Sequence, residues 1–205
     1  MNSKKELEVK LSKLEQVISP KASLEQYITS ADIASDILWF AYLHDDIKGK
    51  AVADLGCGNG ILGIGAALLG ARSVVFLDSD KLSIVAAKKN VRCLGVKNVL
   101  FFNQDIKFFK NKVDTVIQNP PFGVQQEHAD RDFLIAAMKF SNVIYSFHKI
   151  ESKKFIMALA KENGFILEKV IPYIFILKKT QLFHTKNRYR VNVGCFLLRK
   201  IGRNL

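Results

Sequence analysis

The sequence predicts an α/β protein with a doubly wound, mostly parallel seven-stranded sheet, helices on both faces and an antiparallel last strand. From residue 51 onward, short apolar runs without polar alternation take turns with stretches of helical periodicity, a pattern typical of buried parallel strands joined by helices. The first of these runs ends in a glycine-rich turn. The chain has 205 residues, of which 49% are hydrophobic, which is enough for one sizeable domain over residues 1–205.

The first 45 residues are predicted to be helical. Among the lysines and glutamates of residues 4–16, three leucines recur at helical spacing, namely Leu7, Leu11 and Leu14. This spacing predicts an amphipathic helix. A second helix is expected to begin after Thr29 or Ser30, because both residue types are good N-caps, and to run through Ala41.

Residues 46–205 contain the elements of the predicted sheet. Strands are expected at residues 51–55, 73–77, 98–102, 113–118, 143–147, 164–177 and 190–199. Helices are expected at residues 61–69, 81–92, 130–140 and 151–163. The last two strands are expected to be antiparallel neighbours. The chain shows no internal repeat and no low-complexity linker.

The composition limits the setting in which the protein works. No run of about 18 uninterrupted apolar residues occurs, so no membrane span is expected. The N-terminus carries mixed charges instead of an apolar signal region, so a secretory signal is not expected either. Cys57, Cys93 and Cys195 show no paired spacing, which fits a reducing, cytoplasmic setting. The four histidines are scattered and do not resemble a zinc site, so no metal is expected.

Positive charge is concentrated in the C-terminal part of the chain. Residues 1–147 carry 18 Lys and Arg against 16 Asp and Glu, whereas residues 148–205 carry 13 against three. No acidic residue follows Glu168. This distribution favours a polyanionic partner contacted by the C-terminal third, with an ordinary solvated basic surface as the alternative.

A glycine-rich turn joins the first predicted strand to the next helix and reads DLGCGNG at residues 54–60. Its glycines allow a sharp turn and a close approach of the backbone to a ligand. Residues 58–63 also satisfy G-x-G-x-x-G, which keeps a dinucleotide open as the ligand. Asp54, two residues before the first glycine, instead gives a D-x-G-x-G-x-G pattern that resembles motif I of class I methyltransferases. A carboxylate there suits a cationic ligand better than a pyrophosphate.

Further carboxylates near strand ends are candidate ligand contacts. Asp78 ends the second predicted strand and is expected to accept hydrogen bonds from both ribose hydroxyls of either cofactor type. Asp80 is interpreted as the N-cap of the next helix. Asp105 is expected to accept from the adenine amino group of the cofactor while Ile106 donates its backbone N–H. An ordinary loop carboxylate is the alternative for Asp105.

The loop after the fourth predicted strand reads Asn119-Pro120-Pro121-Phe122. Its prolines stiffen the backbone and lack N–H donors, but their carbonyl oxygens can still accept. An exocyclic aromatic amine is a poor nucleophile, because its lone pair is delocalised into the ring. The side-chain oxygen of Asn119 and the carbonyl of Pro120 can each accept one N–H, and Phe122 can stack on the base. The loop therefore predicts methyl transfer to a planar amino group, with a nucleic-acid base unpaired or flipped to enter.

Four segments occur in a fixed order, at residues 24–29, 54–60, 119–123 and 143–149, and read LEQYIT, DLGCGNG, NPPFG and VIYSFHK. Together they resemble the archaeal and eukaryotic methyltransferase-like-five group of adenine-N6 methyltransferases acting on small-subunit ribosomal RNA. The resemblance covers nearly the whole chain, although DNA adenine and protein glutamine methyltransferases share the third motif. It implies a class I Rossmann-like methyltransferase fold with S-adenosylmethionine as cofactor.

The resemblance implies further cofactor contacts. Gln26 and Thr29 would touch the cofactor, and Tyr27 would close over the site. The family usually has proline where this chain has Ile28, so the segment is expected to be less rigid here. Residues of the glycine turn would also line the cofactor, namely Gly56, Asn59, Gly60 and Ile61.

The resemblance extends to the basic tail and to a partner. A family Phe-His-Lys segment is matched in the tail, which is expected to bind RNA by base stacking and phosphate pairing. The predicted RNA contacts are Phe183, His184, Lys186, Arg188 and Arg190. His148 matches a family position, either as a site residue or as an ordinary hydrogen-bonded histidine at a strand end. A small zinc-binding activator subunit would pair through a sheet edge, and the apolar strand 170–177 is compatible with this.

Methylation of adenine N6 in RNA is the leading hypothesis. A protein glutamine methyltransferase would use the same loop, but such enzymes usually carry Asn-Pro-Pro-Tyr and a separate N-terminal helical domain. DNA adenine methyltransferases generally add a target-recognition domain, for which 205 residues leave no room. An RNA-binding assembly factor without the reaction is the non-enzymatic alternative, and the intact glycine turn and Asn119 argue against it.

Overall fold

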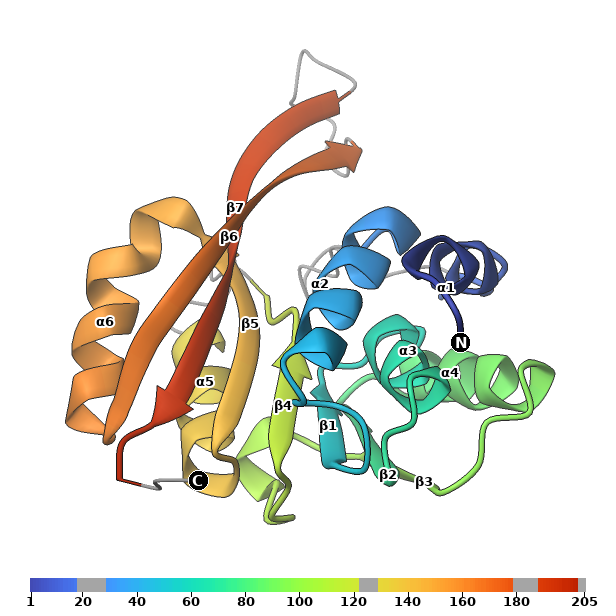
Figure 1. Cartoon of the computed structure of the whole chain (residues 1–205), viewed down its shortest axis with the longest axis horizontal. Coiled ribbons are helices and arrows are strands. Elements are labelled where there is room, and N and C mark those ends of the chain that lie inside the picture. Colours follow the sequence, from blue (N-terminus) through green and yellow to red (C-terminus); the bar gives the residue numbers. More distant parts are fainter. Residues whose placement is uncertain (18–28, 122–128, 179–187, 203–205) are drawn as a thin grey trace.

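The protein forms a seven-stranded sheet in the order β3-β2-β1-β4-β5-β7-β6, as Figure 1 shows. The computed structural model describes residues 1–17, 29–121, 129–178 and 188–202. The strands are β1 (Ala51–Leu55), β2 (Ser73–Asp78), β3 (Val99–Asn103), β4 (Thr115–Gln118), β5 (Val143–Lys149), β6 (Phe165–Lys178) and β7 (Arg188–Lys200). The α-helices are α1 (Lys4–Leu11), α2 (Ala31–Leu43), α3 (Ile61–Leu68), α4 (Lys81–Cys93), α5 (Ala129–Phe140) and α6 (Lys153–Glu162).

The strand directions confirm the predicted fold class. The first five strands pair in parallel, and β7 is antiparallel to both of its neighbours. Each predicted strand and helix is present, and most boundaries differ by one to three residues from those that the sequence predicts. Two short 3-10 helices were not predicted, η2 (Ile106–Phe108) and η3 (Ile150–Ser152).

The first helix is shorter than the sequence predicts, because it ends at Leu11 instead of continuing to residue 16. After it the chain is held by other groups. The Ser12 hydroxyl donates to the carbonyl of Val9 at 3.0 Å, and the backbone N–H of Glu15 donates to the side-chain oxygen of Asn90 on α4 at 2.9 Å. Leu14 is nevertheless buried as predicted. A tertiary contact with α4 therefore replaces the last helical turn.

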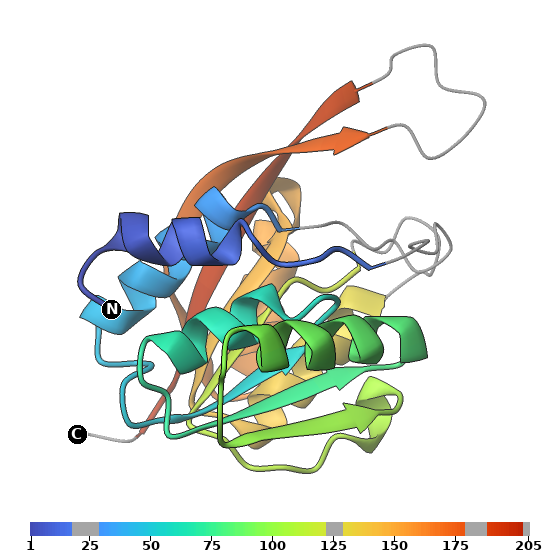
Figure 2. The ribbon, with the colours of Figure 1, turned by 90° about the vertical axis from the view of Figure 1, so that its right-hand side faces the viewer.

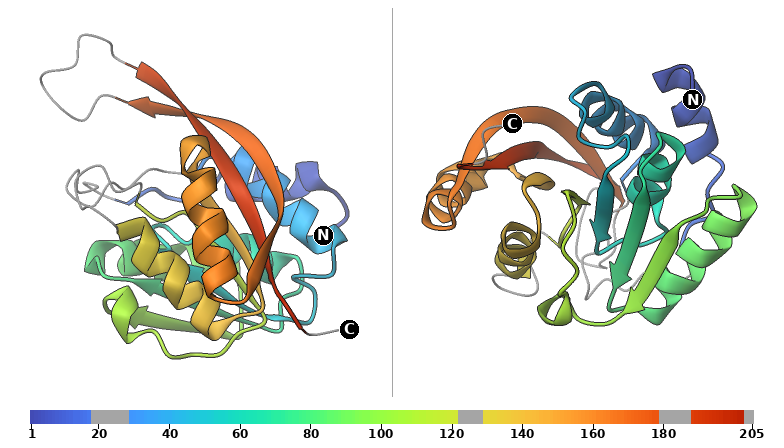
Figure 3. Two further views of the ribbon diagram at one scale, coloured as in Figure 1. Left: turned by 90° about the vertical axis from the view of Figure 1, so that its left-hand side faces the viewer. Right: turned by 60° about the horizontal axis from the view of Figure 1, so that its bottom comes forward.

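Helices cover both faces of the sheet and create two apolar layers, as Figures 2 and 3 show. Helices α1 to α4 pack on one face, where the sheet contributes Ile117 and Tyr145. Helices α5 and α6 pack on the other face, where Val116 and Ile144 point. Successive residues of β4 and β5 thus supply opposite layers, and this explains why apolar residues stand side by side in these strands, as at Val116–Ile117 and Ile144–Tyr145.

The last two strands extend beyond the rest of the sheet. Strand β5 pairs with β7 only as far as Lys149 opposite Val193, whereas β6 and β7 stay paired out to Lys178 opposite Arg188. Figures 1 and 2 show this outer part as a two-stranded ribbon that stands clear of the body. The ribbon projects past the carboxyl end of β5, which is the end of the sheet where parallel strands place their ligand-binding loops.

Three further features concern the described residues alone. None of the helices in this part of the chain is both long and apolar enough to cross a membrane. The same residues contain no group of three or more His, Cys, Asp or Glu side chains arranged to hold a metal ion. All three cysteines are free, with Cys57 and Cys195 buried and Cys93 exposed.

Candidate functional site

The candidate site lies at the carboxyl ends of β1 and β4. Strand β1 pairs with β2 on one side and with β4 on the other, so the strand order reverses between β1 and β4. In open parallel sheets, ligands bind in the crevice outside such a reversal point. The glycine turn follows β1 and the loop beginning at Asn119 follows β4, so the fold brings the two predicted motifs to the same place.

The backbone of the glycine turn requires glycine at two positions in particular. Gly60 caps the start of α3 with a φ of 85°, and a Cβ there would lie 3.2 Å from both Phe76 and Ala87. Gly56 has a φ of 70°, and a Cβ there would lie 3.1 Å from the ring of Phe133. Other residues rarely adopt this left-handed conformation. The turn is tied to β2, because the N–H groups of residues 56 and 57 donate to the carbonyl of Leu77 at 2.8 and 2.9 Å.

Asp54 lies beneath this turn. Its carboxylate is buried and accepts the backbone N–H of Gly63 at 2.8 Å, which fastens the first turn of α3 to the end of β1. Burial raises the pKa of Asp54 well above its usual value, opposed by the Gly63 hydrogen bond and reinforced by the nearby charge of Asp78. The structure thus shows Asp54 holding the turn, and a contact with a ligand stays a prediction.

Asp78 ends β2 beside the same turn. One carboxylate oxygen accepts the N–H of Gly58 at 2.9 Å and the other accepts the N–H of Asp80 at 2.8 Å. Burial raises the pKa of Asp78, although these hydrogen bonds oppose the shift. The side chain of Ser83 also forms a hydrogen bond with this carboxylate. Because a carboxylate offers about four acceptor positions, Asp78 retains capacity for a further donor. Asp80 caps α4 as predicted and accepts the N–H of Leu82.

Asn119 meets the segment that precedes α2. Its side-chain nitrogen donates to the hydroxyl of Thr29 at 3.0 Å, and Thr29 is buried. Pro120 is buried and Pro121 is partly buried. Two residues predicted for different roles, one catalytic and one for the cofactor, are thereby in direct contact. Gln26, Tyr27 and Phe122 lie outside the described residues.

Asn59 is held by a contact that the sequence did not predict. The side-chain amide of Asn59 donates to the backbone carbonyl of Glu15 at 3.1 Å. The backbone carbonyl of Asn59 accepts the side-chain N–H of Asn90 at 2.9 Å. Asn90 also donates to the carbonyl of Glu15. The sequence feature that could have indicated this contact is Asn90, a polar residue on the buried face of α4 beside Ala87 and Val91. Ile61 is buried in the first turn of α3.

The remaining predicted residues lie in different surroundings. Asp105 is exposed and caps η2 by accepting the N–H of Lys107 at 2.9 Å, while Ile106 is buried. Its contact with adenine stays a prediction. Among the predicted RNA contacts, Phe183, His184 and Lys186 lie outside the described residues. Arg188 and Arg190 belong to the ribbon strand β7, where Arg190 is exposed.

Taken together, the described residues form a site suited to two ligand parts. The glycine turn and Asp78 present backbone groups and a carboxylate, as a nucleoside portion requires. Asn119 and Pro120 present an amide and a carbonyl at the end of β4, the strand that lies between β1 and β5. This arrangement suits the transfer of a small group from a nucleoside-containing ligand to a planar amine.

Comparison with known proteins agrees with this reading. Residues 28–141, more than half of the chain, match the family model of the Methyltransferase small domain. The chain is 35% identical to the rRNA N(6)-adenosine-methyltransferase METTL5 of Danio rerio over 92% of this chain and 95% of that protein. It is 37% identical to an uncharacterized protein of Methanocaldococcus jannaschii over 98% and 96% of the two chains.

Solved structures give the same picture. The crystal structure of a Pyrococcus horikoshii protein, described as a candidate RNA methyltransferase, superimposes with a TM-score of 0.91 and 40% sequence identity. The match covers 98% of this chain and 100% of that one. A Thermoplasma acidophilum protein superimposes with a TM-score of 0.75 and 30% identity over 99% and 100% of the two chains.

Proposed function

Because the chain belongs to the methyltransferase small domain family and, within it, to the METTL5 group of rRNA N6-adenosine methyltransferases, we propose that it methylates adenine N6 in ribosomal RNA, with small-subunit rRNA as the substrate. The chain is an S-adenosylmethionine-dependent methyltransferase. The observation that carries the proposal is the meeting of the glycine turn and Asn119 at the reversal point between β1 and β4.

The described residues fit S-adenosylmethionine. Asp78 accepts two backbone N–H groups and a bond from Ser83, and its remaining acceptor capacity is proposed to serve the ribose hydroxyls. A Cβ at Gly58 would meet nothing within 4 Å, so the turn is open at this position, and Gly56 and Gly60 are proposed as backbone contacts of the cofactor. The other proposed contacts are Gln26, Tyr27, Thr29, Asp54, Asn59, Ile61, Asp105 and Ile106. When bound, S-adenosylmethionine supplies a methyl group activated by its sulfonium.

The chain's own residues position the nitrogen that receives the methyl group. We assign the side-chain oxygen of Asn119 and the carbonyl of Pro120 as acceptors for the two N–H bonds of adenine N6. The Thr29 hydroxyl accepts a hydrogen bond from the side-chain nitrogen of Asn119, and this contact orients the amide so that its oxygen points away from Thr29. Pro121 and Phe122 would set the plane of the base. The proposed catalytic contribution is therefore orientation of the amine and partial localisation of its lone pair.

The direct test is transfer of labelled methyl from S-adenosylmethionine to purified small-subunit rRNA, followed by nucleoside analysis. Label on N6-methyladenosine is the expected result. Label on a protein glutamine or on DNA adenine, with none on RNA, would reject the proposed substrate. Binding of RNA without any transfer and without cofactor binding would support an assembly factor instead.

Asp78→Ala is expected to weaken S-adenosylmethionine binding about 10- to 100-fold, because it removes the proposed carboxylate acceptor for the ribose hydroxyls. It also removes the bond that holds Gly58. Isothermal titration calorimetry measures the Kd. The matched control is Asp114→Ala at the opposite end of the sheet, where the carboxylate accepts the N–H of Ala51 at 2.8 Å. Equal losses for the two variants would argue against a ribose contact.

RNA is proposed to reach the site along the ribbon of β6 and β7. The ribbon projects at the same end of the sheet as the site, and no acidic residue follows Glu168. The proposed contacts are Arg188 and Arg190 of β7, together with Phe183, His184 and Lys186, which lie outside the described residues. A single strand entering along such a surface can present an unstacked adenine to the Asn119 loop.

Arg190→Ala is expected to weaken RNA binding at all sequences and to reduce the slope of log K against log salt by about 1, as loss of one phosphate contact does. Fluorescence anisotropy at several salt concentrations measures this. The control is Arg72→Ala, an exposed arginine at the opposite end of the sheet that pairs with Asp114 at 3.4 Å. An unchanged slope for Arg190→Ala would remove the ribbon from the RNA path.

We also propose a small zinc-binding activator subunit that adds a strand to a sheet edge. The sequence pointed to residues 170–177 of β6, but β6 carries a bulge between Leu167 and Lys169 and a proline at 172, features that discourage edge pairing. The opposite edge strand, β3, has no charged residue and exposes 54% of Leu100. We therefore favour β3, which co-purification of the subunit with a Leu100→Lys variant would test.

A cytoplasmic location is proposed from the thiols and the substrate. The three cysteines are free, and burial raises the pKa of Cys57 and Cys195 well above the usual value. Unpaired cysteines are typical of reducing compartments, which also contain the proposed ribosomal RNA. Fractionation of the native cells would test this location.

A further inference from the structure

A chain of four polar side chains crosses the otherwise apolar layer between the sheet and α5. Gln118 at the end of β4 donates its side-chain N–H to the hydroxyl of Ser146 at 2.9 Å. That hydroxyl lies 2.7 Å from Nε2 of His148, and Nδ1 of His148 lies 3.7 Å from a carboxylate oxygen of Asp130. Gln118, Ser146 and His148 are all at most 1% exposed. Buried polar groups in such a layer are costly unless they are paired.

The two ring nitrogens of His148 face different partners, Ser146 and Asp130. Ser146 accepts from Gln118 and lies 2.7 Å from Nε2 of His148, in a hydrogen bond whose donor depends on the tautomer of the imidazole. The other ring nitrogen, Nδ1, faces Asp130. Burial alone would raise the pKa of Asp130, but its interaction with His148 outweighs burial and holds that pKa below its usual value. The carboxylate of Asp130 therefore favours a proton on the Nδ1 atom that faces it.

The two ends of this chain of contacts have a special place in the sequence. Gln118 immediately precedes Asn119, and Asp130 stands in the first turn of α5, the next described helix. Gln118 is the last residue of β4, before the segment that begins with Asn119. Asp130 is the second residue of α5, the helix that follows this segment in the sequence. Gln118 and Ser146 are also directly opposite each other in the sheet. His148 on β5 thus contacts Asp130 directly and Gln118 through Ser146, the two residues on either side of the segment 119–129.

We infer that His148 is a positioning residue for methyl transfer, which through Ser146 and Gln118 sets the backbone from which Asn119 and Pro120 begin. The inference rests on the proposed function of that loop. Two buried atoms of these described side chains, Oε1 of Gln118 and Nδ1 of His148, have no hydrogen-bond partner. A simple packing role would be met more cheaply by apolar side chains, as it is in the rest of this layer.

His148→Phe tests the inference, because phenylalanine keeps the ring volume against Phe196 and removes both nitrogens. The matched control is Tyr145→Phe on the same strand, which loses a buried hydroxyl contact to Asp46 on the opposite face. We expect His148→Phe to lower kcat roughly 10- to 100-fold, with the Kd for S-adenosylmethionine within about twofold, as a small misplacement of a reacting group does. Tyr145→Phe is expected to keep kcat within about twofold while lowering Tm.

Two further variants and a hydrogen-exchange measurement separate positioning from general damage. His148→Gln retains an amide that can reach Ser146 and should recover part of the lost kcat. Ser146→Ala breaks the chain at its centre and replaces His148→Phe if that variant does not fold. Amide hydrogen exchange of the peptide that ends at Asn119 should be faster in His148→Phe, and in Ser146→Ala, than in Tyr145→Phe.

The outcomes are distinct. Equal kcat in His148→Phe and Tyr145→Phe, or a loss of kcat matched by an equal loss of S-adenosylmethionine affinity, overturns the inference. If the wild-type protein places no methyl group on adenine N6, the proposed function fails. The hydrogen-exchange comparison still decides whether His148 fixes the end of β4: faster exchange supports this role and unchanged exchange rejects it.

Discussion

Replacing Asn119 with alanine is expected to lower kcat for methyl transfer to RNA about a thousandfold, the scale seen when one preorganised hydrogen-bonding group is removed from an active site. Adenine N6 is a weak nucleophile because its lone pair is shared with the ring. Asn119 would hold one N–H and help to localise that lone pair, and alanine cannot accept a hydrogen bond. Single-turnover transfer of labelled methyl to rRNA measures the chemical step without interference from product release.

S-adenosylmethionine binding should survive this substitution within about threefold, because the proposed ribose contact at Asp78 and the glycine turn are unchanged. Thr29→Val removes the acceptor for the Asn119 nitrogen and should cost kcat about tenfold, since the amide then loses its fixed orientation. Asn163→Ala, at the end of α6, is the control and should leave kcat unchanged. An Asn119→Ala enzyme that keeps more than about a tenth of wild-type kcat would show that Asn119 does not hold the reacting nitrogen.

The parts of the site that the sequence predicted well are those set by local chemistry. The glycine turn was predictable because its left-handed positions demand glycine, as the φ of 85° at Gly60 shows. The location of Asn119 followed from counting strands, because the fourth parallel strand places its carboxyl end beside the first. Both inferences need only short stretches of sequence and the rules of parallel sheets.

Other parts depended on contacts between distant segments. Nothing near residue 148 in the sequence indicates Asp130 as a partner, and Asn90 joins Glu15 across 75 positions. The same limit explains the early end of the first helix, where Glu15 binds Asn90 instead of continuing the turn. Strand β4 starts at Thr115 instead of residue 113, because the Asp114 side chain is used to accept the N–H of Ala51.

Asp54 illustrates a third limit, which is that a motif does not state which way a side chain points. The pattern D-x-G-x-G-x-G predicted a carboxylate near a cationic ligand. In the structure this carboxylate accepts the N–H of Gly63 beneath the turn. Its position thus supports the turn directly, by fastening α3 to the end of β1.

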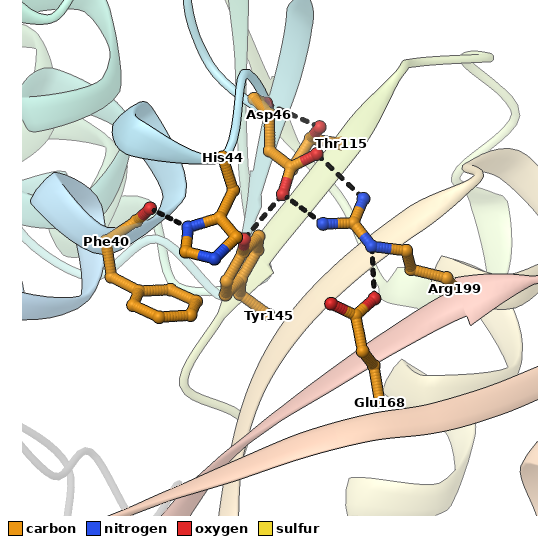
Figure 4. A network of polar contacts seen from close by, with 7 residues as sticks. All are labelled: Phe40, His44, Asp46, Thr115, Tyr145, Glu168 and Arg199. Carbon is orange, nitrogen blue, oxygen red and sulfur yellow. Dashed lines mark hydrogen bonds and ion pairs between the residues drawn. The ribbon is translucent and has the colours of Figure 1, made fainter. Parts of the chain in front are cut away.

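A network of polar contacts that the sequence did not reveal is centred on Asp46, which lies between α2 and β1. Figure 4 shows its carboxylate receiving both terminal nitrogens of Arg199, at 2.9 and 2.8 Å, and the hydroxyl of Tyr145 at 2.5 Å. Its backbone carbonyl accepts the hydroxyl of Thr115. One residue therefore joins β4, β5 and β7 at the amino end of β4, away from the catalytic loop. Arg199 is held additionally by Glu168 of β6.

Asp46→Ala is expected to lower the free energy of unfolding by about 3 kcal/mol, the lower end of the range for removing one partner of a buried ion pair, because Arg199 keeps Glu168. The Tyr145 hydroxyl would be left without its acceptor in a buried place. Glu168→Ala is the control and should cost less than about 1 kcal/mol, since this contact is partly exposed. Urea unfolding measures both through the midpoint at constant m. Because the network is remote from Asn119, kcat of folded Asp46→Ala should match wild type at low temperature. Equal destabilisation by the two substitutions would mean that the Glu168 contact, and not Asp46, holds β7 in the sheet.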